Sequence, residues 1–271
     1  MSNLALRAIT ALFGAALIIS AIVYASWSFA LVIAIIMVLS LHEFYQLARQ
    51  SGRSPFEIWG QGFAIIMFFL FYAYFQFELA ERFFWLLPPF LSVAFIYPLY
   101  ANNGSHAINC LAITLLGVVY IALPMSLFTA IAFLDGSYQF VFVVGILFLQ
   151  WANDTGAYFV GQAIGRVKLF ERVSPNKTWE GCIGGGLLAL VFAFGFSQYF
   201  DDISVWAWLG LGAIVAIFGT LGDLTESLFK RTLAIKDSGK SIPGHGGFLD
   251  RFDGLLLSLP FTTAYLHFIT S

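Results

Sequence analysis

The feature that most constrains the fold of this chain is a succession of long apolar stretches separated by short polar segments. A helix needs about 20 mainly apolar residues to cross a hydrocarbon core of about 30 Å, because each residue adds about 1.5 Å. Nine stretches reach or nearly reach that length: residues 8–24, 28–47, 58–77, 83–100, 107–134, 138–160, 180–199, 203–221 and 252–269. We therefore predict an all-α polytopic integral membrane protein with about nine transmembrane helices.

Composition agrees with this prediction. Hydrophobic residues make up 60% of the chain and charged residues only 10%, against about 25% charged in an average soluble domain. The first stretch follows Arg7 and resembles a signal peptide, but no small-residue cleavage site leads into a soluble domain, so we predict a retained span. The fifth stretch contains Pro124, which removes a backbone donor and is predicted to kink, tilt or divide it.

The basic residues predict the orientation. If the N-terminus is cytoplasmic, only Arg82 of the 13 lysines and arginines falls on the outer side, which is the bias of the positive-inside rule. We predict a single membrane-embedded domain over residues 1–271 in the cytoplasmic (inner) membrane. Its N-terminal helices occupy 1–135, and a catalytic region occupies 138–271.

Two predicted cytoplasmic loops, 161–179 and 222–251, are the polar segments with room for chemistry. A transporter more often scatters its ionisable residues within the spans at mid-bilayer depth. Here the ionisable residues gather at one membrane face. We therefore predict an active site at the cytoplasmic face.

The second loop begins with GDLTESLFKR, in which Asp223, Glu226, Ser227 and Lys230 recur every three or four residues. If this stretch is helical, the four side chains share one face. The alternative interpretation is an amphipathic helix at the membrane surface, in which Glu226 pairs with Lys230.

The end of the second loop, GHGGFLDRFD, combines glycines with two aspartates. Glycines such as Gly246 and Gly247 permit close backbone approach, so their N–H groups can form a concave nest around phosphate oxygens. Asp250 and Asp253 follow at a spacing of three, and carboxylates beside a phosphate site typically hold a hard cation such as Mg²⁺. The alternative for Asp250 is a role in starting the last helix without any metal.

The tripeptide GKS at 239–241 resembles the end of a P-loop. That motif needs a glycine five positions before Gly239, where Ala234 stands, and a preceding buried strand. We therefore reject it. Lys236 and Lys240 remain candidate phosphate partners, because an ammonium neutralises phosphate as a point charge.

The first loop offers a second group of polar residues. Asp154 lies near the predicted cytoplasmic end of a span, where an unpaired charge facing lipid costs about 2–3 kcal/mol, so we expect it to face the protein interior or a polar cleft. SPNKTWEG is typical of a helix start, with Ser174 or Thr178 as the cap and Glu180 in the first turn. Lys177 with these hydroxyls would form a seat for a lipid phosphate or a nucleotide tail.

Other polar or small residues receive structural interpretations. His42 and Glu43 are interpreted as interfacial polar residues near the inner end of the second span. GCIGGG, residues 181–186, is predicted to allow close helix packing. Cys110 and Cys182 lie in apolar surroundings without a metal-ligand spacing, so we expect small hydrophobic side chains.

The run SLFKRTLAIKDSGKSIPGHGGFLDRFD, residues 227–253, resembles the signature of phosphatidate cytidylyltransferases (CDP-diacylglycerol synthases). The matching positions are Ser, Lys-Arg, Lys-Asp, Pro-x-His-Gly-Gly and Asp-Arg-x-Asp at corresponding separations. NDTGAYFVG and SPNKTWEG also look like the family's sequences, although Asn176 stands where the family often has a second lysine beside Lys177. The resemblance covers most of the chain after about residue 140.

This resemblance implies a reaction of phospholipid biosynthesis, in which CTP and phosphatidate give CDP-diacylglycerol and pyrophosphate with the help of Mg²⁺. It also implies a homodimer, and a second, monovalent cation such as K⁺ is a further candidate. Two alternatives stay open. One is a CTP-dependent polyprenol or phytol kinase, and the other, from a different class, is a cation or phosphate transporter.

Residue type and resemblance together assign the expected site. The expected metal ligands are Asp223, Asp250 and Asp253. The expected catalytic residues are these three together with Lys230 and Arg251. The expected substrate-binding residues are Asp154, Ser174, Lys177, Thr178, Ser227, Arg231, Lys236, Asp237, His245, Gly246 and Gly247.

Overall fold

The fold is almost entirely helical. The computed structural model describes residues 3–100, 107–232 and 247–270. The first helices are α1 (Asn3–Tyr24), α2 (Ser26–Gln50), α3 (Glu57–Phe77), η1 (Glu81–Leu86), α4 (Leu87–Tyr100), α5 (Ala107–Gly117), η3 (Val118–Ala122) and α6 (Leu123–Ala132). The later elements are α7 (Phe140–Ile164), β1 (Lys168–Phe170), β2 (Ser174–Thr178), α8 (Trp179–Ser197), α9 (Val205–Thr232) and α10 (Leu249–Thr270).

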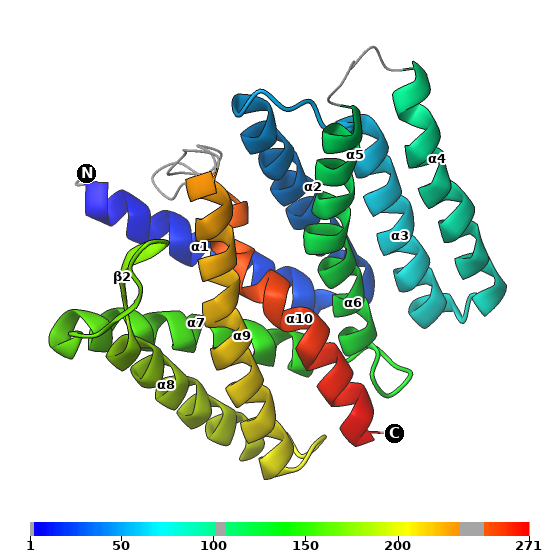
Figure 1. Cartoon of the computed structure of the whole chain (residues 1–271). Coiled ribbons are helices and arrows are strands. Elements are labelled where there is room, and N and C mark those ends of the chain that lie inside the picture. The colour runs from blue at the N-terminus through cyan, green and yellow to red at the C-terminus, as the bar shows by residue number, and fades with distance from the viewer. Residues whose placement is uncertain (1–2, 101–106, 233–246, 271) are drawn as a thin grey trace. The chain divides into compact units, whose positions relative to one another are not determined.

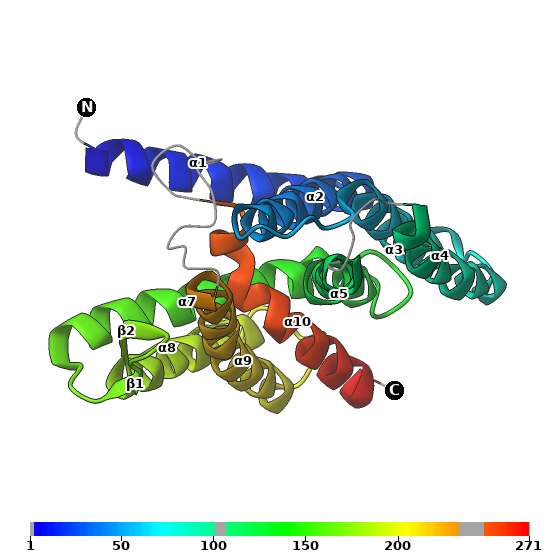
Figure 2. The ribbon, with the colours of Figure 1, turned by 45° about the horizontal axis from the view of Figure 1, so that its top comes forward.

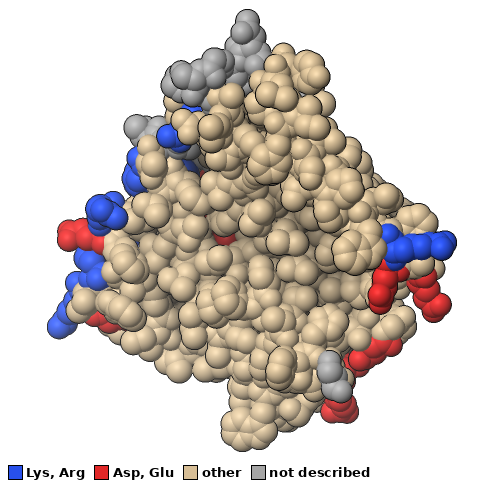
Figure 3. All heavy atoms as spheres, turned by 45° about the vertical axis from the view of Figure 1, so that its right-hand side comes forward, with Lys and Arg blue, Asp and Glu red and all other residues tan. Residues whose placement is uncertain are grey.

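Within the described residues, seven helical segments are long and apolar enough to cross a membrane. They are α2, α3, η1 with α4, α5 through α6, α7, α8 and α9. On the face drawn in Figure 3, uncharged residues fill most of the surface, and charged side chains show mainly in small groups near its margins. The prediction of an all-α polytopic membrane protein is therefore confirmed.

The first and last predicted spans are also helical, as α1 and α10. Neither is among the seven, and only Leu12–Tyr24 of α1 counts as a shorter apolar helix. The count of nine spans and the cytoplasmic N-terminus therefore stay predictions.

The chain forms two compact units. The first contains Met1–Tyr138 and Thr232–Arg251, and the second contains Gln139–Arg231 and Phe252–Ser271. Helix α10 (Figure 1) therefore starts in the first unit and continues in the second.

The fifth predicted span is one continuous helical segment with a wider turn in its middle. The turn is η3, where the N–H of Leu123 donates to Val118 O, five residues back. Pro124 follows at the start of α6. Because proline lacks an N–H and its ring clashes with the preceding turn, a wide turn just before it lets the helix continue.

Tyr45, fully buried on α2, fixes the packing of the first unit. Its hydroxyl donates to Thr114 O on α5 at 2.9 Å. The Thr114 hydroxyl in turn accepts from the backbone N–H of Phe56, just before α3, at 2.8 Å. An added Cβ at Gly117 would lie 2.7 Å from the Tyr45 ring, so the missing side chain on α5 makes this close approach possible.

Glu43 corrects one interpretation from the sequence. Its side chain is buried, with 1% of its surface exposed, and its Oε2 accepts the backbone N–H of Leu249 at 2.9 Å. A carboxylate at a helix N-terminus satisfies a backbone donor and complements the helix dipole. The interpretation of Glu43 as an interfacial residue is therefore wrong, because α2 uses it to hold the start of α10. The side chain of its neighbour His42 is 43% exposed and pairs with Glu57.

Close helix packing in the second unit involves the predicted small-residue run. Helices α7 and α8 lie side by side (Figures 1 and 2). An added Cβ at Gly156 would lie 2.9 Å from Gly184 O and 2.9 Å from Gly185 Cα. The prediction that GCIGGG serves helix packing is thus confirmed.

The predicted loop 161–179 contains an element that the sequence did not predict. Strands β1 and β2 pair antiparallel between α7 and α8 (Figure 2). Thr178 caps α8, because its Oγ1 accepts the N–H of Gly181 at 3.2 Å. Of the two predicted caps, Thr178 is the one that the structure uses, and Ser174 begins strand β2.

The predicted loop 222–251 is helical at its start. Helix α9 continues through Thr232, so Asp223, Glu226, Ser227 and Lys230 all lie on a helix. The hydroxyl of Ser227 donates to Asp223 Oδ1 at 3.3 Å, and Glu226 pairs with Lys230 at 2.6 Å. These contacts between residues four apart match the predicted helical face.

Candidate active site

The centre of the candidate site is an ion pair between the β-hairpin and α9. Lys177 Nζ on β2 lies 2.6 Å from Asp223 Oδ2. The same ammonium donates to the backbone oxygen of Thr220 at 3.3 Å. The cap of α8 at Thr178 fixes the end of β2, so the hairpin delivers Lys177 to one side of α9. Two residues that are 46 positions apart in the sequence are therefore in direct contact.

Two further carboxylates belong to this cluster. Asp253 on α10 interacts electrostatically with Asp223, Asp154 and Lys177. The backbones of α9 and α10 are in contact here, since an added Cβ at Gly222 would lie 2.6 Å from Asp253 O. We call Asp154, Asp223, Asp253 and Lys177 the carboxylate cluster. It joins α7, α9, α10 and the hairpin.

The cluster carries more negative than positive charge. The cluster has three carboxylates and one ammonium, and neighbouring carboxylates repel one another unless a cation neutralises them. Among residues 3–100, 107–232 and 247–270, no three acidic, histidine or cysteine side chains form a ready-made metal cage. The donor set nevertheless fits Mg²⁺, which prefers oxygen ligands and is typically held by one or two carboxylates with water and substrate phosphates.

Lys230 and Arg231 have protein partners at the end of α9. Lys230 Nζ lies 2.6 Å from Oε2 of the buried Glu226. The Nε of Arg231 donates to Val173 O, next to the hairpin, at 3.3 Å. The alternative interpretation of this stretch included the Glu226–Lys230 pair, and that pair is present. It is compatible with a structural role for Lys230, while the predicted catalytic role stays a prediction.

Asp250, Arg251 and Gly247 belong to the first unit. Asp250 lies in the first turn of α10, and its Oδ2 accepts the N–H of Gly247 at 3.3 Å. This contact favours the alternative in which Asp250 helps to start the helix. Asp250 and Asp253 are three residues apart on one helix, so they share a side of α10. Arg251 is exposed.

The predicted residues Lys236, Asp237, His245 and Gly246 lie outside the described residues, as does Lys240. Ser174 is partly buried on β2, three residues before Lys177. Asp154 is exposed on α7 and accepts a hydrogen bond from Gln150 Nε2 at 3.1 Å.

Comparison with known proteins identifies the family. The model of the Cytidylyltransferase family matches residues 5–269 of the chain. The chain belongs to the Cytidylyltransferase family. This match includes every residue of the carboxylate cluster and all the predicted site residues.

Several curated proteins are similar in sequence to this chain. A protein of Haemophilus influenzae named phosphatidate cytidylyltransferase is 45% identical over 129 residues, which are 46% of this chain and 45% of the relative. Proteins of the same name are similar in Bacillus subtilis, with 42% identity over 147 residues and 54% of each chain, and in Staphylococcus haemolyticus. The latter is 41% identical over 150 residues, which are 55% of this chain and 56% of the relative. The matched region thus spans about half the length of these curated relatives.

Sequence reasoning missed two buried amides beside the cluster. Gln150 and Asn153 lie on α7, and 6% and 1% of their surfaces are exposed. Asn153 Nδ2 donates to Thr220 Oγ1 at 3.4 Å. A polar residue within a strongly apolar helix was the available signal, because such residues typically face the protein interior.

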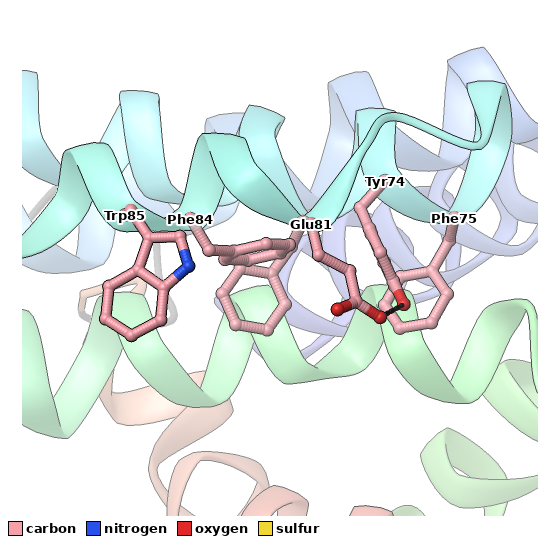
Figure 4. Close-up of a pocket in the computed structure, with 6 residues that line it drawn as sticks. Tyr74, Phe75, Glu81, Phe84 and Trp85 are labelled. Carbon is pink, nitrogen blue, oxygen red and sulfur yellow. Dashed lines mark hydrogen bonds between the residues drawn. The ribbon is translucent and has the colours of Figure 1, made fainter.

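An aromatic pocket of about 410 Å³ in the first unit is unrelated to the predicted residues. It is lined by Phe71, Tyr74, Phe75, Glu81, Phe84 and Trp85 (Figure 4). The hydroxyl of Tyr74 donates to Glu81 at 3.5 Å across it. Its lining comes from α3 and η1, and none of the predicted site residues contributes to it.

Proposed function

We propose that this member of the Cytidylyltransferase family is a phosphatidate cytidylyltransferase, which converts CTP and phosphatidate into CDP-diacylglycerol and pyrophosphate. The observation that carries the proposal is the carboxylate cluster, where Lys177 contacts Asp223 beside Asp253 and Asp154. Family membership and the names of the relatives support it.

The proposed step is a transfer of the cytidylyl group. A phosphate oxygen of phosphatidate attacks the α-phosphorus of CTP, and the bond from that phosphorus to the bridging oxygen breaks. Pyrophosphate leaves with the electron pair of that bond. Because the attacking oxygen is already anionic, the reaction needs no strong general base. The protein must instead bring two polyanions together and stabilise the charge that develops.

In this proposal the carboxylates of Asp223 and Asp253 would hold Mg²⁺, and Asp250 stays the third predicted ligand. When bound, Mg²⁺ supplies positive charge to the substrate phosphates. Lys177 neutralises phosphate charge from the hairpin side. Its ammonium is oriented by the ion pair with Asp223. Loss of one such contact typically costs several kcal/mol of transition-state stabilisation.

The remaining predicted residues receive supporting roles. Lys230, Arg231, Lys236 and Arg251 neutralise phosphates, and His245 with Gly246 and Gly247 shapes the nucleotide loop. Ser174 and Thr178 belong to the same strand as Lys177, and they are proposed to approach the lipid headgroup or the nucleotide tail. Ser227 contacts Asp223 directly and helps to hold its carboxylate.

The site is proposed to open to the cytoplasmic face of the inner membrane, in a homodimer. Phosphatidate would enter sideways from the leaflet, because its acyl chains would otherwise have to leave the hydrocarbon. A monovalent cation such as K⁺ is a candidate second cofactor.

The deciding experiment incubates the purified full-length protein with labelled CTP and phosphatidate, with and without Mg²⁺. We expect CDP-diacylglycerol and pyrophosphate in equal amounts, and only with the metal. A polyprenol or phytol kinase would instead release CDP from CTP and phosphorylate a supplied alcohol. A transporter would make no CDP-lipid. Either result would replace the proposed function.

A further inference from the structure

Gln150 lies at the junction of the three helices that carry the acidic residues of the cluster. It is on α7, one helical turn before Asp154, and 6% of its surface is exposed. Its Nε2 donates to Asp154 Oδ1 at 3.1 Å. Its Oε1 is buried and has no hydrogen-bond partner among the described residues. Burying the amide oxygen of a glutamine without a hydrogen-bond partner lowers the stability of the fold. The presence of Gln150 at this position therefore suggests a functional role.

The end of this side chain occupies a gap that two glycines create. An added Cβ at Gly219 on α9 would lie 3.0 Å from Cδ of Gln150. An added Cβ at Gly254 on α10 would also lie 3.0 Å from that atom. The amide therefore packs against both helices where neither has a side chain.

These two contacts fall beside the acidic residues. Gly219 lies four residues before Asp223, which is about one helical turn, and Gly254 directly follows Asp253. A side chain held between these positions packs against α9 and α10 beside the acidic residues, and its hydrogen bond orients Asp154.

We propose that Gln150 is a positioning residue for the reaction, which holds Asp154, Asp223 and Asp253 in the arrangement that the cation and the substrate phosphates require. This inference rests on the proposed function and extends it to a residue that touches neither substrate nor metal. Its only side-chain hydrogen bond among the described residues goes to one of the three carboxylates.

Gln61 provides a matched control. It lies on α3 in the first unit, where its Nε2 donates to Val38 O on α2 at 3.0 Å. Its Oε1 is likewise buried without a partner among the described residues. Gln150→Met and Gln61→Met therefore each remove one hydrogen bond donated by a side-chain amide, at similar volume. The acceptor is a carboxylate of the cluster for Gln150 and a backbone oxygen for Gln61.

The first test compares these two variants in purified full-length protein. We expect Gln150→Met to lower kcat roughly tenfold, which is the effect of one hydrogen bond to a charged group. It should also raise the Mg²⁺ concentration for half-maximal rate several-fold. Gln61→Met should change neither value by more than about twofold, and both variants should lose similar thermal stability. Equal Mg²⁺ requirements in the two variants would overturn the proposal.

The second test measures cation binding without turnover. Mn²⁺ replaces Mg²⁺ in the presence of CTP and the absence of phosphatidate, and the bound ion is followed by electron paramagnetic resonance. Weaker Mn²⁺ binding in Gln150→Met than in Gln61→Met supports the role, and equal binding contradicts it. If the wild type makes no CDP-lipid at all, the proposed function fails, while this measurement still reports on Gln150.

Gly219→Ala, a change on α9, also tests whether Gln150 positions the carboxylates. The three atoms nearest to the added methyl all belong to the Gln150 side chain. That obstacle is the end of a flexible side chain, so the fold should tolerate the methyl while the amide moves away from Asp154. We expect a raised Mg²⁺ requirement with little loss of thermal stability. An unchanged Mg²⁺ requirement in stable Gly219→Ala protein would contradict the proposal.

Discussion

Helix α9 supplies the carboxylates of two lysine–carboxylate pairs that have the same length and very different surroundings. The Lys177–Asp223 pair and the Lys230–Glu226 pair both measure 2.6 Å. In the first, the side chains are 23% and 37% exposed and come from different elements. In the second, they are 14% and 1% exposed and lie four residues apart on one helix.

The difference between the two pairs lies in burial and neighbours, since their chemistry and distance agree. Asp223 interacts electrostatically with Asp253 and remains accessible, so a cation or a phosphate can replace or join its lysine. Glu226 is enclosed, and an unpaired charge there would be costly. We therefore expect the Lys177–Asp223 pair to serve the reaction and the buried Glu226 to stabilise the fold through its pairing with Lys230.

The largest expected effect comes from Asp223→Asn. The change keeps the size of the side chain and removes the charge on which both Lys177 and the proposed Mg²⁺ depend. We expect about a thousandfold loss of kcat, or roughly 4 kcal/mol of transition-state stabilisation. Thermal stability should change little, because the pair is partly exposed. If Asp223→Asn turned over labelled CTP at close to the wild-type rate, the Lys177–Asp223 pair would not serve the reaction.

Glu226→Gln should lower thermal stability more than turnover, which is the reverse of the result expected for Asp223→Asn. Removing one partner of a buried ion pair typically costs about 3–5 kcal/mol, because the other charge is left uncompensated. We expect a large fall in the unfolding midpoint in detergent, with a smaller loss of turnover per folded molecule than in Asp223→Asn.

The double variant Glu226→Leu with Lys230→Met separates the structural from the catalytic role of this pair. Replacing both partners of a buried ion pair with apolar residues of similar volume often keeps the protein stable, so its activity can still be measured. A double variant that is stable but inactive would support the predicted catalytic role of Lys230. One that is stable and active would assign this pair to the fold alone.

Lys177→Met is expected to lower the rate about a hundredfold, or roughly 2.7 kcal/mol, since it removes a phosphate contact but leaves the carboxylates. Lys177→Arg keeps the positive charge with a different shape, so it should recover part of the rate. Steady-state rates at varied CTP and phosphatidate would measure both effects. Equal rates for the Met and Arg variants would show that the charge of Lys177 is not used.

The sequence predicted the features that depend on local spacing. The helical face of α9 followed from residues three and four apart, and Thr178 was one of the two caps predicted for α8, with Ser174 as the other. The match of residues 227–253 to a family signature agreed with the family model. These signals lie within one or two helical turns, or within one contiguous motif.

The features that the sequence did not reveal depend on contacts between distant segments. Lys177 and Asp223 are in separate predicted loops, so their direct contact depends on the path of the short hairpin. Glu43 and Leu249 are 206 residues apart. Gln150 is four residues before Asp154 on α7, so spacing indicates that contact, but not the packing of its amide against α9 and α10. In each case, tertiary packing decides which polar groups meet.

Glu43 gives the smallest expected effect and a direct test of how the start of α10 is held. It is buried like Glu226, yet its partner is the backbone of the helix that carries Asp250 and Asp253. Glu43→Ala leaves the Leu249 N–H without its acceptor, which typically costs about 0.5–2 kcal/mol for a helix cap. Glu43→Gln keeps an acceptor oxygen and should lose less, because only the attraction between the charge and the helix dipole disappears. Hydrogen exchange across 247–253 should therefore speed up most in the Ala variant, with a several-fold loss of turnover. Unchanged exchange in Glu43→Ala would show that α10 is held elsewhere.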